Sequence, residues 1–398
     1  SYIGGAAIVA YSAYVYEFGI SAIAVFIGTA AGFLLFIPYA LKLRKISSEK
    51  QFITLSDWFY FNYNKKTGLL SAAILMIVYF GMLVNQFIAG SSILANISGL
   101  KYETALLISS AIIGIYLLAG GFSSVVKTDV FQYLVLFVLF VLLGFLMIRG
   151  DSQFTAELAD FSRMDPMMTV VFIAFGILII FQSAEYWQRV YAAKSRLVVR
   201  KGLVGSAVLI VLTGLAVSIV GLSAHLHVPG IPSRDAFAEG LKLLVSSRFI
   251  GLSLVLLFAA IMSSADTIIF VLASSLSKDY LARMKKGATD DHLLKKYTRW
   301  FILLFIIAGS GFAWVFSNLV TVILFITGIG FTIIPAAIAS FHVKLASKAV
   351  IGSFLTGLLY VLILVSTGNL IPELSIASIV VSAIFLLIFQ GIYKKNIS

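Results

Sequence analysis

The sequence has no cysteine, only four histidines and six prolines among 398 residues, and few charges, with Asp, Glu, Lys and Arg at 12%. The absence of Cys excludes a disulfide framework, a thiolate metal site and a cysteine nucleophile. Soluble domains carry about twice this share of charged residues, whereas 61% of the residues here are apolar. Few Pro and 31 Gly favour long helices with local breaks over disordered linkers. The composition predicts a polytopic membrane protein, with residues 1–398 as a single transmembrane domain.

Apolar segments of about 20 residues, the length that crosses a bilayer as a helix, follow one another along the chain. They are predicted at 18–43, 67–97, 103–119, 124–148, 167–191, 199–225, 248–280, 296–316, 318–342, 346–367 and 373–393. Residues 1–16 are short for a span, which is typical of half a helix, so upstream residues are expected to be missing. Two helices outside the spans are also expected. One covers an aromatic stretch at 54–64, which should lie at the membrane interface, and one covers 233–245, with Ser233 as its cap.

The net charge of +12 does not indicate nucleic-acid binding, because the basic residues lie in short loops between apolar segments. All but six of the 29 Lys and Arg fall in alternate loops; the six are Lys101, Arg149, Arg163, Arg234, Lys242 and Arg248. The positive-inside rule then places the Lys- and Arg-rich loops and the C-terminus in the cytoplasm. We therefore expect a cell-membrane protein that sits in the lipid bilayer, binds no nucleic acid and needs no obligatory protein partner.

The most informative stretch is Ala259–Thr267, in the middle of a long apolar run. Ser263 and Thr267 are four residues apart and share a helix face, with Ser264 and Asp266 close to the same side. An ionisable Asp deep in a span marks a functional site by default, and these hard oxygen ligands suit a small cation such as sodium. The alternative is that the hydroxyls only bond within their own helix or to a neighbouring one.

Three other places carry polar or flexible groups inside apolar segments. The pair Gly4 and Gly5 weakens a helix and frees backbone carbonyls, which transporters use to coordinate ions and substrate; a close helix crossing is the alternative. Asn85 and Gln86 place two amides in one span, either for a substrate or for bonds between helices. Gln182 lies where the helix from Met168 turns polar, which predicts a helix broken near mid-membrane and an amide facing a substrate.

Other candidates have simpler interpretations. Asp129 lies near the start of a predicted helix, where a carboxylate is favourable, and is deep enough to reach a neighbouring helix. Trp187 and Arg189 are typical interface anchors. His225 and His227 alternate in an external loop without further ligands and are predicted to be solvent-exposed. The sequence has no nucleotide loop, Ser-His-Asp pattern or carboxylate dyad, so no enzyme is predicted.

Three motifs together carry a resemblance. They are Gly-Gly-Phe-Ser-Ser-Val-Val-Lys-Thr-Asp-Val-Phe-Gln at 120–132, Tyr-Trp-Gln-Arg-Val-Tyr-Ala-Ala-Lys at 186–194, and Ala-Ala-Ile-Met-Ser-Ser-Ala-Asp-Thr at 259–267. In order and spacing they resemble the sodium/solute symporter family of sodium-coupled sugar, proline and sialic-acid carriers. The resemblance implies an all-α membrane protein of the leucine-transporter type, an inverted five-plus-five helix repeat with broken core helices and accessory C-terminal helices. Residues 1–16 would be the outer half of core helix 1, its inner half and the preceding helix being absent.

The resemblance also implies a sodium site between core helices 1 and 8. Ala260 would offer its carbonyl oxygen, and Ser263 and Ser264 their hydroxyls. Asp129 matches the family's Asp beside the sodium path, and Asp266 and Thr267 occupy the later hydroxyl positions, which are candidates for a second ion site or for coupling. Asp266 departs from the Ser-rich form.

Around that ion, the candidate pocket residues are Gly4, Gly5, Asn85, Gln86 and Gln182. Glu185 stands at an inner-gate position that is aromatic in sugar carriers, which argues against a sugar.

The sequence therefore favours sodium-coupled import of a small organic solute by alternating access. Proton coupling through Asp129 or Asp266 is one alternative. A transporter-like sensor module is another, against which we note that no signalling domain follows the last helix.

Overall fold

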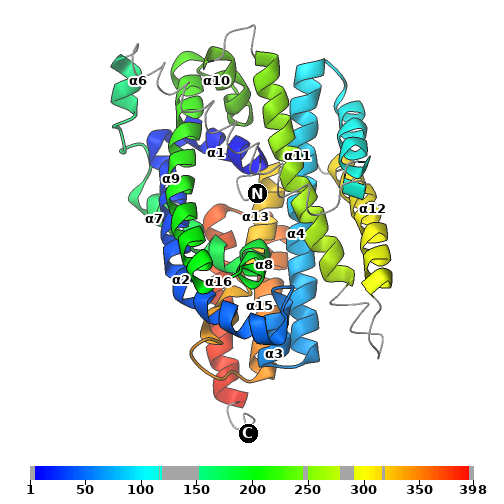
Figure 1. The fold of residues 1–398 in the computed structure, drawn as a ribbon. Helices are drawn as coiled ribbons and strands as arrows, with labels where there is room; N and C mark the ends of the chain where they lie inside the picture. Colours follow the sequence, from blue (N-terminus) through cyan, green and yellow to red (C-terminus); the bar gives the residue numbers. More distant parts are fainter. Residues whose placement is uncertain are drawn as a thin grey trace.

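The computed structural model describes residues 5–115, 117–118, 152–244, 250–277, 291–315 and 319–393, and every regular element among them is helical (Figure 1). The expected span at 124–148, with Asp129, lies outside the described residues, as does Gly4.

The elements follow in chain order, with a further apolar helix at Tyr102–Ile115. They are α1 (Gly5–Phe18), η1 (Gly19–Ile23), α2 (Ala24–Lys50), α3 (Ser56–Asn62), α4 (Lys65–Ser98), α6 (Ser152–Glu157), α7 (Pro166–Gln182), α8 (Ala184–Ala192), α9 (Arg196–His227), η2 (Ser233–Asp235), α10 (Ala236–Leu244), α11 (Ile250–Ser275), α12 (Asp291–Val315), α13 (Leu319–Phe331), α14 (Ile334–Ala339), α15 (Ser347–Ser366) and α16 (Pro372–Tyr393).

Within the described residues, seven helices are long and apolar enough to cross a membrane, or eight when the bent pair α7–α8 counts as one span. Helices α4, α9, α15 and α16 begin and end within three residues of the predicted spans. The predicted span at 318–342 is confirmed as a candidate span at Val322–Ala339, within which a turn at Thr332–Ile333 separates α13 from α14. Pro335 in the first turn of α14 has no amide to continue the helix before it.

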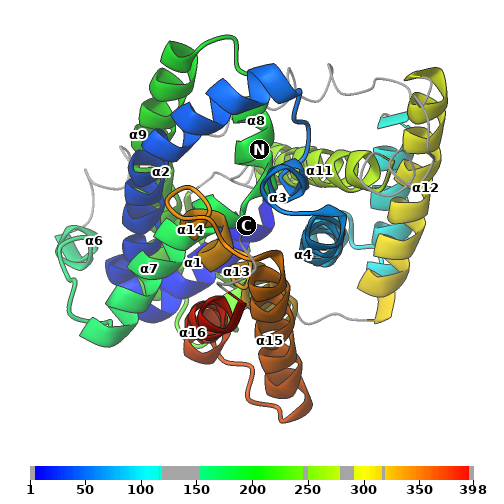
Figure 2. The same ribbon diagram turned by 90° about the horizontal axis from the view of Figure 1, so that it is seen from below.

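The helices form three groups around a centre (Figure 2). Helices α2, α7 and α9 lie on one side, α4, α11 and α12 on another, and α15 with α16 on a third, while α1 and α13 lie between them. The apolar side chains of the three groups meet in one continuous buried core. The centre is therefore reached by helices from both halves of the chain.

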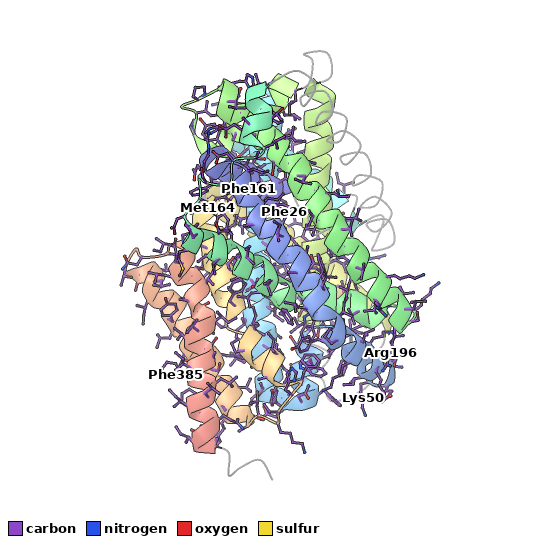
Figure 3. All side chains as sticks on the ribbon, turned by 90° about the vertical axis from the view of Figure 1, so that its left-hand side faces the viewer. Phe26, Lys50, Phe161, Met164, Arg196 and Phe385 are labelled. Carbon is purple, nitrogen blue, oxygen red and sulfur yellow. The ribbon has the colours of Figure 1, made fainter. Side chains whose placement is uncertain are left out.

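Glycines allow α2 and α7 to approach with backbones nearly touching. A Cβ on Gly28 would lie 2.2 Å from the Ile173 carbonyl oxygen, and one on Gly176 would lie 2.3 Å from that of Val25. On the neighbouring face of α2, Phe26 fills the space left by Gly214 of α9 (Figure 3). Small residues at such crossings are the usual means of close helix packing in membranes, and here they bring α7 directly against α2.

An aromatic cluster joins α3 to α2, α8 and the segment that follows α14. Trp58 stacks on Phe341 at 4.4 Å between ring centroids, and Trp187 packs at 5.9 Å from Phe36 and 6.0 Å from Phe341. Trp58 is 1% exposed and Trp187 is 0% exposed. The prediction that Trp187 anchors the protein at the membrane interface is therefore wrong, because long-range aromatic neighbours bury it, whereas Arg189 is exposed.

Polar contacts tie the end of α1 to α9 and to the segment before α7. The Nδ1–H of His225 donates to the Tyr16 carbonyl oxygen at 2.6 Å, and Arg163 donates to the Nε2 of His225. Arg163 also pairs with Glu157 and, at 3.4 Å, with Asp160. His225 is therefore half-buried and bonded, which corrects the prediction of a solvent-exposed residue, while His227 is exposed.

A short helix follows α9, as predicted, but its start differs. Ser233 begins the 3₁₀ turn η2 and Pro232 is the residue before it, so Ser233 does not act as a side-chain cap. Helix α10 packs on α9 and α1, and Phe237 is buried there. The predicted helix thus packs against α1.

Candidate functional site

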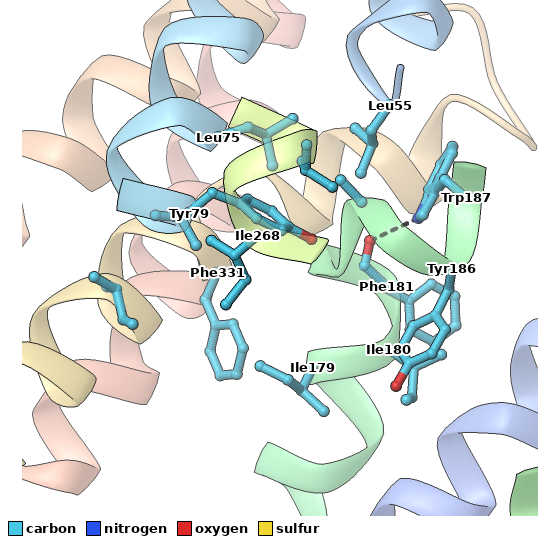
Figure 4. Close-up of a cluster of buried hydrophobic side chains, with 14 of the residues drawn as sticks. Leu55, Leu75, Tyr79, Ile179, Ile180, Phe181, Tyr186, Trp187, Ile268 and Phe331 are labelled. Carbon is cyan, nitrogen blue, oxygen red and sulfur yellow. Dashed lines mark hydrogen bonds between the residues drawn. The ribbon is translucent and has the colours of Figure 1, made fainter. Parts of the chain in front are cut away.

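The centre of the molecule contains a broken helix. Helices α7 and α8 meet at Ser183, whose backbone is extended (ψ 105°), and the two axes differ by 48°. In a continuous helix the Phe181 carbonyl would accept the Glu185 amide. Instead, the indole of Trp187 donates to the Phe181 carbonyl at 3.1 Å (Figure 4), and the Glu185 amide donates to the Tyr79 hydroxyl at 3.2 Å. Both freed backbone groups therefore have hydrogen-bond partners, and a helix break inside a membrane protein requires such partners. The predicted break is confirmed.

Tyr79 also holds the Glu185 side chain. Its hydroxyl donates to Glu185 Oε2 while it accepts the amide of the same residue. Tyr79 is 3% and Glu185 8% exposed. The single phenol thus caps the start of α8 and joins it to α4.

Three buried amides are sequence-predicted pocket residues; one lies at the break and the other two lie on α4, the helix that Tyr79 joins to it. Asn85 and Gln86 of α4 and Gln182 at the end of α7 are at most 7% exposed. The carbonyl oxygen of each amide has no hydrogen-bond partner among the described residues. An unsatisfied buried acceptor costs about 1–3 kcal/mol, so these oxygens are suited to receive N–H or O–H groups of a bound molecule.

Helical geometry gives the two amides of α4 different directions. Gln86 lies seven residues after Tyr79, so it shares the face toward α8, about 10 Å farther along the axis. Asn85 lies four residues after Gly81, which packs so closely on α13 that a Cβ would be 2.1 Å from Ile326 Cγ2. Asn85 therefore shares the face toward α13. No hydrogen bond joins these amides to Gln182 in the part of the chain that the structure describes.

Gln182 rests against α13. A Cβ on Gly330 would lie 2.1 Å from Gln182 Nε2 and 2.2 Å from its Cδ. Phe331, the next residue, is fully buried and its ring centroid is 5.8 Å from that of Phe175 on α7. Figure 4 places Phe331 in the same cluster as Tyr79, Ile179 and Ile268. Gly330 thus provides the notch that fixes the Gln182 amide.

Five of the six predicted ion-site residues, all but Asp129, lie on α11, an unbroken helix that contacts both α1 and α4. Ser264 and Asp266 are 3% and 1% exposed, and Thr267 is half-buried with its hydroxyl 3.4 Å from Asp266 Oδ1. Ala260 and Ser263 are in the same helix, and Gly5 is the first residue of α1. The two helices that the predicted sodium site needs are therefore in contact.

A small cavity adjoins the Tyr79–Glu185 contact on the side toward α3. Its lining comes from the α3 region, α4, α8 and α11, and consists of Thr54, Leu55, Ser56, Leu75, Met76, Tyr79, Ala184, Gln188, Val271, Leu272 and Ser275. The fully buried hydroxyl of Ser56 has no partner among the described residues.

Two residues of the candidate site, Tyr79 and Gly330, were not predicted from the sequence, although the seven-residue spacing from Tyr79 to Gln86 was a signal for Tyr79.

Comparison with known sequences decides the family. The Sodium:solute symporter family model matches residues 1–346. The chain belongs to this family. It is 25% identical to the sodium/pantothenate symporter of Haemophilus influenzae over 269 residues, which cover 63% of this chain and 55% of that protein. It is 24% identical over 327 residues to a sodium/proline symporter of Staphylococcus aureus, 75% of this chain and 63% of that protein.

The chain thus spans little more than half the length of the first of these relatives. The family and these relatives are transporters rather than enzymes, and the family, together with the apolar spans, makes the chain a multi-pass membrane protein.

Solved structures show the fold. A sodium-coupled sialic acid symporter in a substrate-bound, outward-open state superposes with a TM-score of 0.78 at 16% identity, over 98% of this chain and 89% of that one. Mhp1, a nucleobase-cation-symport-1 family transporter, gives a TM-score of 0.57 at 13% identity, over 99% and 93%. The fold is therefore the leucine-transporter type, an inverted five-plus-five repeat with accessory helices, as predicted.

Proposed function

We propose that the protein is a secondary active transporter that imports a small organic solute together with sodium by alternating access. The observation that carries this proposal is the Gln182 amide. It is 2% exposed, lies at the α7–α8 break and has an unpartnered oxygen, in a chain whose family consists of sodium:solute symporters. Broken helices near the midplane are where such transporters bind ions and substrate.

Sodium is assigned to the contact between α1 and α11. Ala260 would offer its carbonyl oxygen, Ser263 and Ser264 their hydroxyls, and the backbone at Gly4–Gly5 would complete the set from the other helix. The donors are hard oxygen atoms, the type that small hard cations take. One charge moving inward across 100 mV supplies about 2.3 kcal/mol, which is the driving force available to each coupled sodium ion.

A second ion or coupling group is assigned to Asp129, Asp266 and Thr267. Asp266 is 1% exposed, and an ionisable side chain buried within a membrane span marks a functional site by default. Proton coupling through Asp266 remains the alternative that the experiment below separates from sodium coupling.

The solute is assigned to the space between α1, α4, α7 and α13. The carbonyl oxygens of Asn85, Gln86 and Gln182 accept N–H or O–H groups, and their NH₂ groups donate to a carboxylate. Proline, pantothenate and sialic acid, the solutes named for relatives, are all small carboxylic acids with N–H or O–H donors. A molecule of this class offers partners to the donors and acceptors of these three amides.

Glu185 and Tyr79 are assigned to the inner gate. They join α8 to α4 between the amides and the small cavity, so solute released inward passes this contact. Lys50 and Arg196 lie near each other at one end of the molecule (Figure 3). Under the positive-inside rule that end, and with it the C-terminus, faces the cytoplasm of the cell.

The test is uptake by the purified full-length protein in liposomes, with labelled proline and pantothenate as probes. We expect uptake driven by an inward sodium gradient and not by an equal potassium gradient, and a raised sodium requirement in Ser264→Ala. Uptake driven by a pH gradient without sodium would favour proton coupling through Asp266. Solute binding without uptake under any gradient would favour a transporter-like sensor.

A further inference from the structure

The second interruption of a central helix lies between α13 and α14. The Thr332 amide bonds to the Ile329 carbonyl and the Ile333 amide to that of Gly330, both at 3.2 Å. These are three-residue turns, whereas a continued α-helix would bond the Thr332 amide to the Gly328 carbonyl. The bend therefore leaves the Gly328 carbonyl, inside the protein, without the backbone N–H donor that a continuous helix would give it.

A serine of the last helix supplies the missing donor. The Ser378 hydroxyl of α16, which is fully buried, donates to the Gly328 carbonyl at 2.8 Å. Three residues earlier on the same face, the Ser375 hydroxyl donates to the Leu324 carbonyl at 2.5 Å. Leu324 lies a turn before the bend, where α13 is intact, so Ser375 adds a bond to a helix that does not need one. Ser378 and Ser375 thus make the same kind of bond from one face of α16, but only the Ser378 bond replaces a lost helical bond.

Helix α15 makes room for the bend on its other side. A Cβ on Gly357 would lie 2.6 Å from Thr332 Cγ2, so the Thr332 side chain fills the place of the missing atom. The Ser353 hydroxyl of α15 donates to the Ser382 carbonyl of α16 at 2.7 Å, which holds the two helices together as one support. Both lie beyond residue 346, where the family match ends.

The bend positions a wall of the candidate solute pocket. Gly330 lies two residues before Thr332 and forms the notch for the Gln182 amide, and Phe331 packs toward α7. We infer that Ser378 is a positioning residue: by bonding the Gly328 carbonyl it maintains the α13–α14 bend, and through Gly330 it sets the place of Gln182. The same rule operates at the α7–α8 break, where Trp187 bonds the freed Phe181 carbonyl.

The test uses hydrogen–deuterium exchange of the full-length protein in detergent, which does not depend on the proposed function. Ser378→Ala is compared with Ser375→Ala and with Ser378→Thr, which keeps a hydroxyl. We expect faster exchange in the peptide covering Gly328–Ile334 only in Ser378→Ala. If Ser378→Ala does not yield folded protein, Gly357→Ala perturbs the same bend from α15, and faster exchange in the same peptide is again expected.

A second arm rests on the proposed function and measures uptake of labelled proline and pantothenate. Ser378→Ala should raise the solute KM about fivefold, the value of one hydrogen bond, with a smaller change in maximal rate and no change in Ser375→Ala. Equal exchange in the two alanine variants, or an unchanged peptide in Ser378→Ala and Gly357→Ala, would overturn the inference. Absence of uptake in the unsubstituted protein would count against the proposed function only, because the exchange result stands by itself.

Discussion

Gly330→Ala is the substitution whose effect the structure defines best. The added methyl group would lie 2.1 Å from Gln182 Nε2 and 2.2 Å from Gln182 Cδ, well inside contact distance. The glutamine end is the more flexible partner, so we expect the amide to move and α13 to stay. Losing one solute hydrogen bond corresponds to about 1 kcal/mol, or a solute KM about fivefold higher. The crowding itself should lower the stability of the folded protein by about 1–3 kcal/mol.

The assay is a double-mutant cycle with Gln182→Ala, measured as solute KM for sodium-driven uptake. If Gly330→Ala acts through the amide, it should have little further effect once Gln182 is truncated, because coupled neighbours are not additive. Gly311→Ala is the matched control, since a Cβ there meets nothing within 4 Å. Additive effects of the two substitutions, or an unchanged KM in Gly330→Ala, would refute the proposed contact between the notch and the pocket.

Three further predictions concern the contacts that surround this site. Tyr79→Phe removes both bonds to Glu185 and should lower the free energy of unfolding by denaturant by about 1–3 kcal/mol. It should also increase the leak of solute across liposomes that contain the protein. A variant with unchanged stability and unchanged leak would contradict the gate assignment. Trp187→Phe keeps an aromatic side chain, although a smaller one, and leaves the Phe181 carbonyl without the indole donor, so a similar loss of stability is expected in denaturant unfolding. The Ser162 hydroxyl and amide hold the pKa of Asp160 below its ordinary value. The lowered pKa means that ionised Asp160 stabilises the folded state; this contribution is complete above the unfolded pKa and is lost as pH falls through the lower folded pKa. In Ser162→Ala the pKa of Asp160, followed by NMR, should rise.

Much of the fold follows from local pattern. Apolar runs of spanning length predicted α9, α15 and α16 within three residues, because in a bilayer each helix satisfies its own backbone. The break after Gln182 was also predictable, since an apolar run ends there in polar residues. The bend at Thr332 was not, because its stabilising donor, Ser378, is 50 residues from the Gly328 carbonyl that it bonds.

The candidate site was predictable by residue type but not by partner. The amides of Asn85, Gln86 and Gln182 are unusual in apolar spans wherever they point, so the sequence alone selects them. Tyr79 meets Glu185 across 106 residues, so the seven-residue spacing from Gln86 distinguishes Tyr79 among the 17 tyrosines of the chain but does not identify Glu185 as its partner. Trp187 was misassigned for the same reason, because a tryptophan at the polar end of a helix is typical of an interface until its tertiary neighbours are known.

The central claim is that sodium binds the folded protein at α11. The most direct measurement is thermal stability of the purified full-length protein in detergent, titrating sodium against potassium at constant ionic strength. A ligand that binds only the folded state stabilises it by about 2.7 kcal/mol at 100 times its Kd, so a saturable, sodium-specific rise in Tm is predicted, and Ser264→Ala should weaken it. Equal Tm in sodium and potassium over the whole titration would contradict the account.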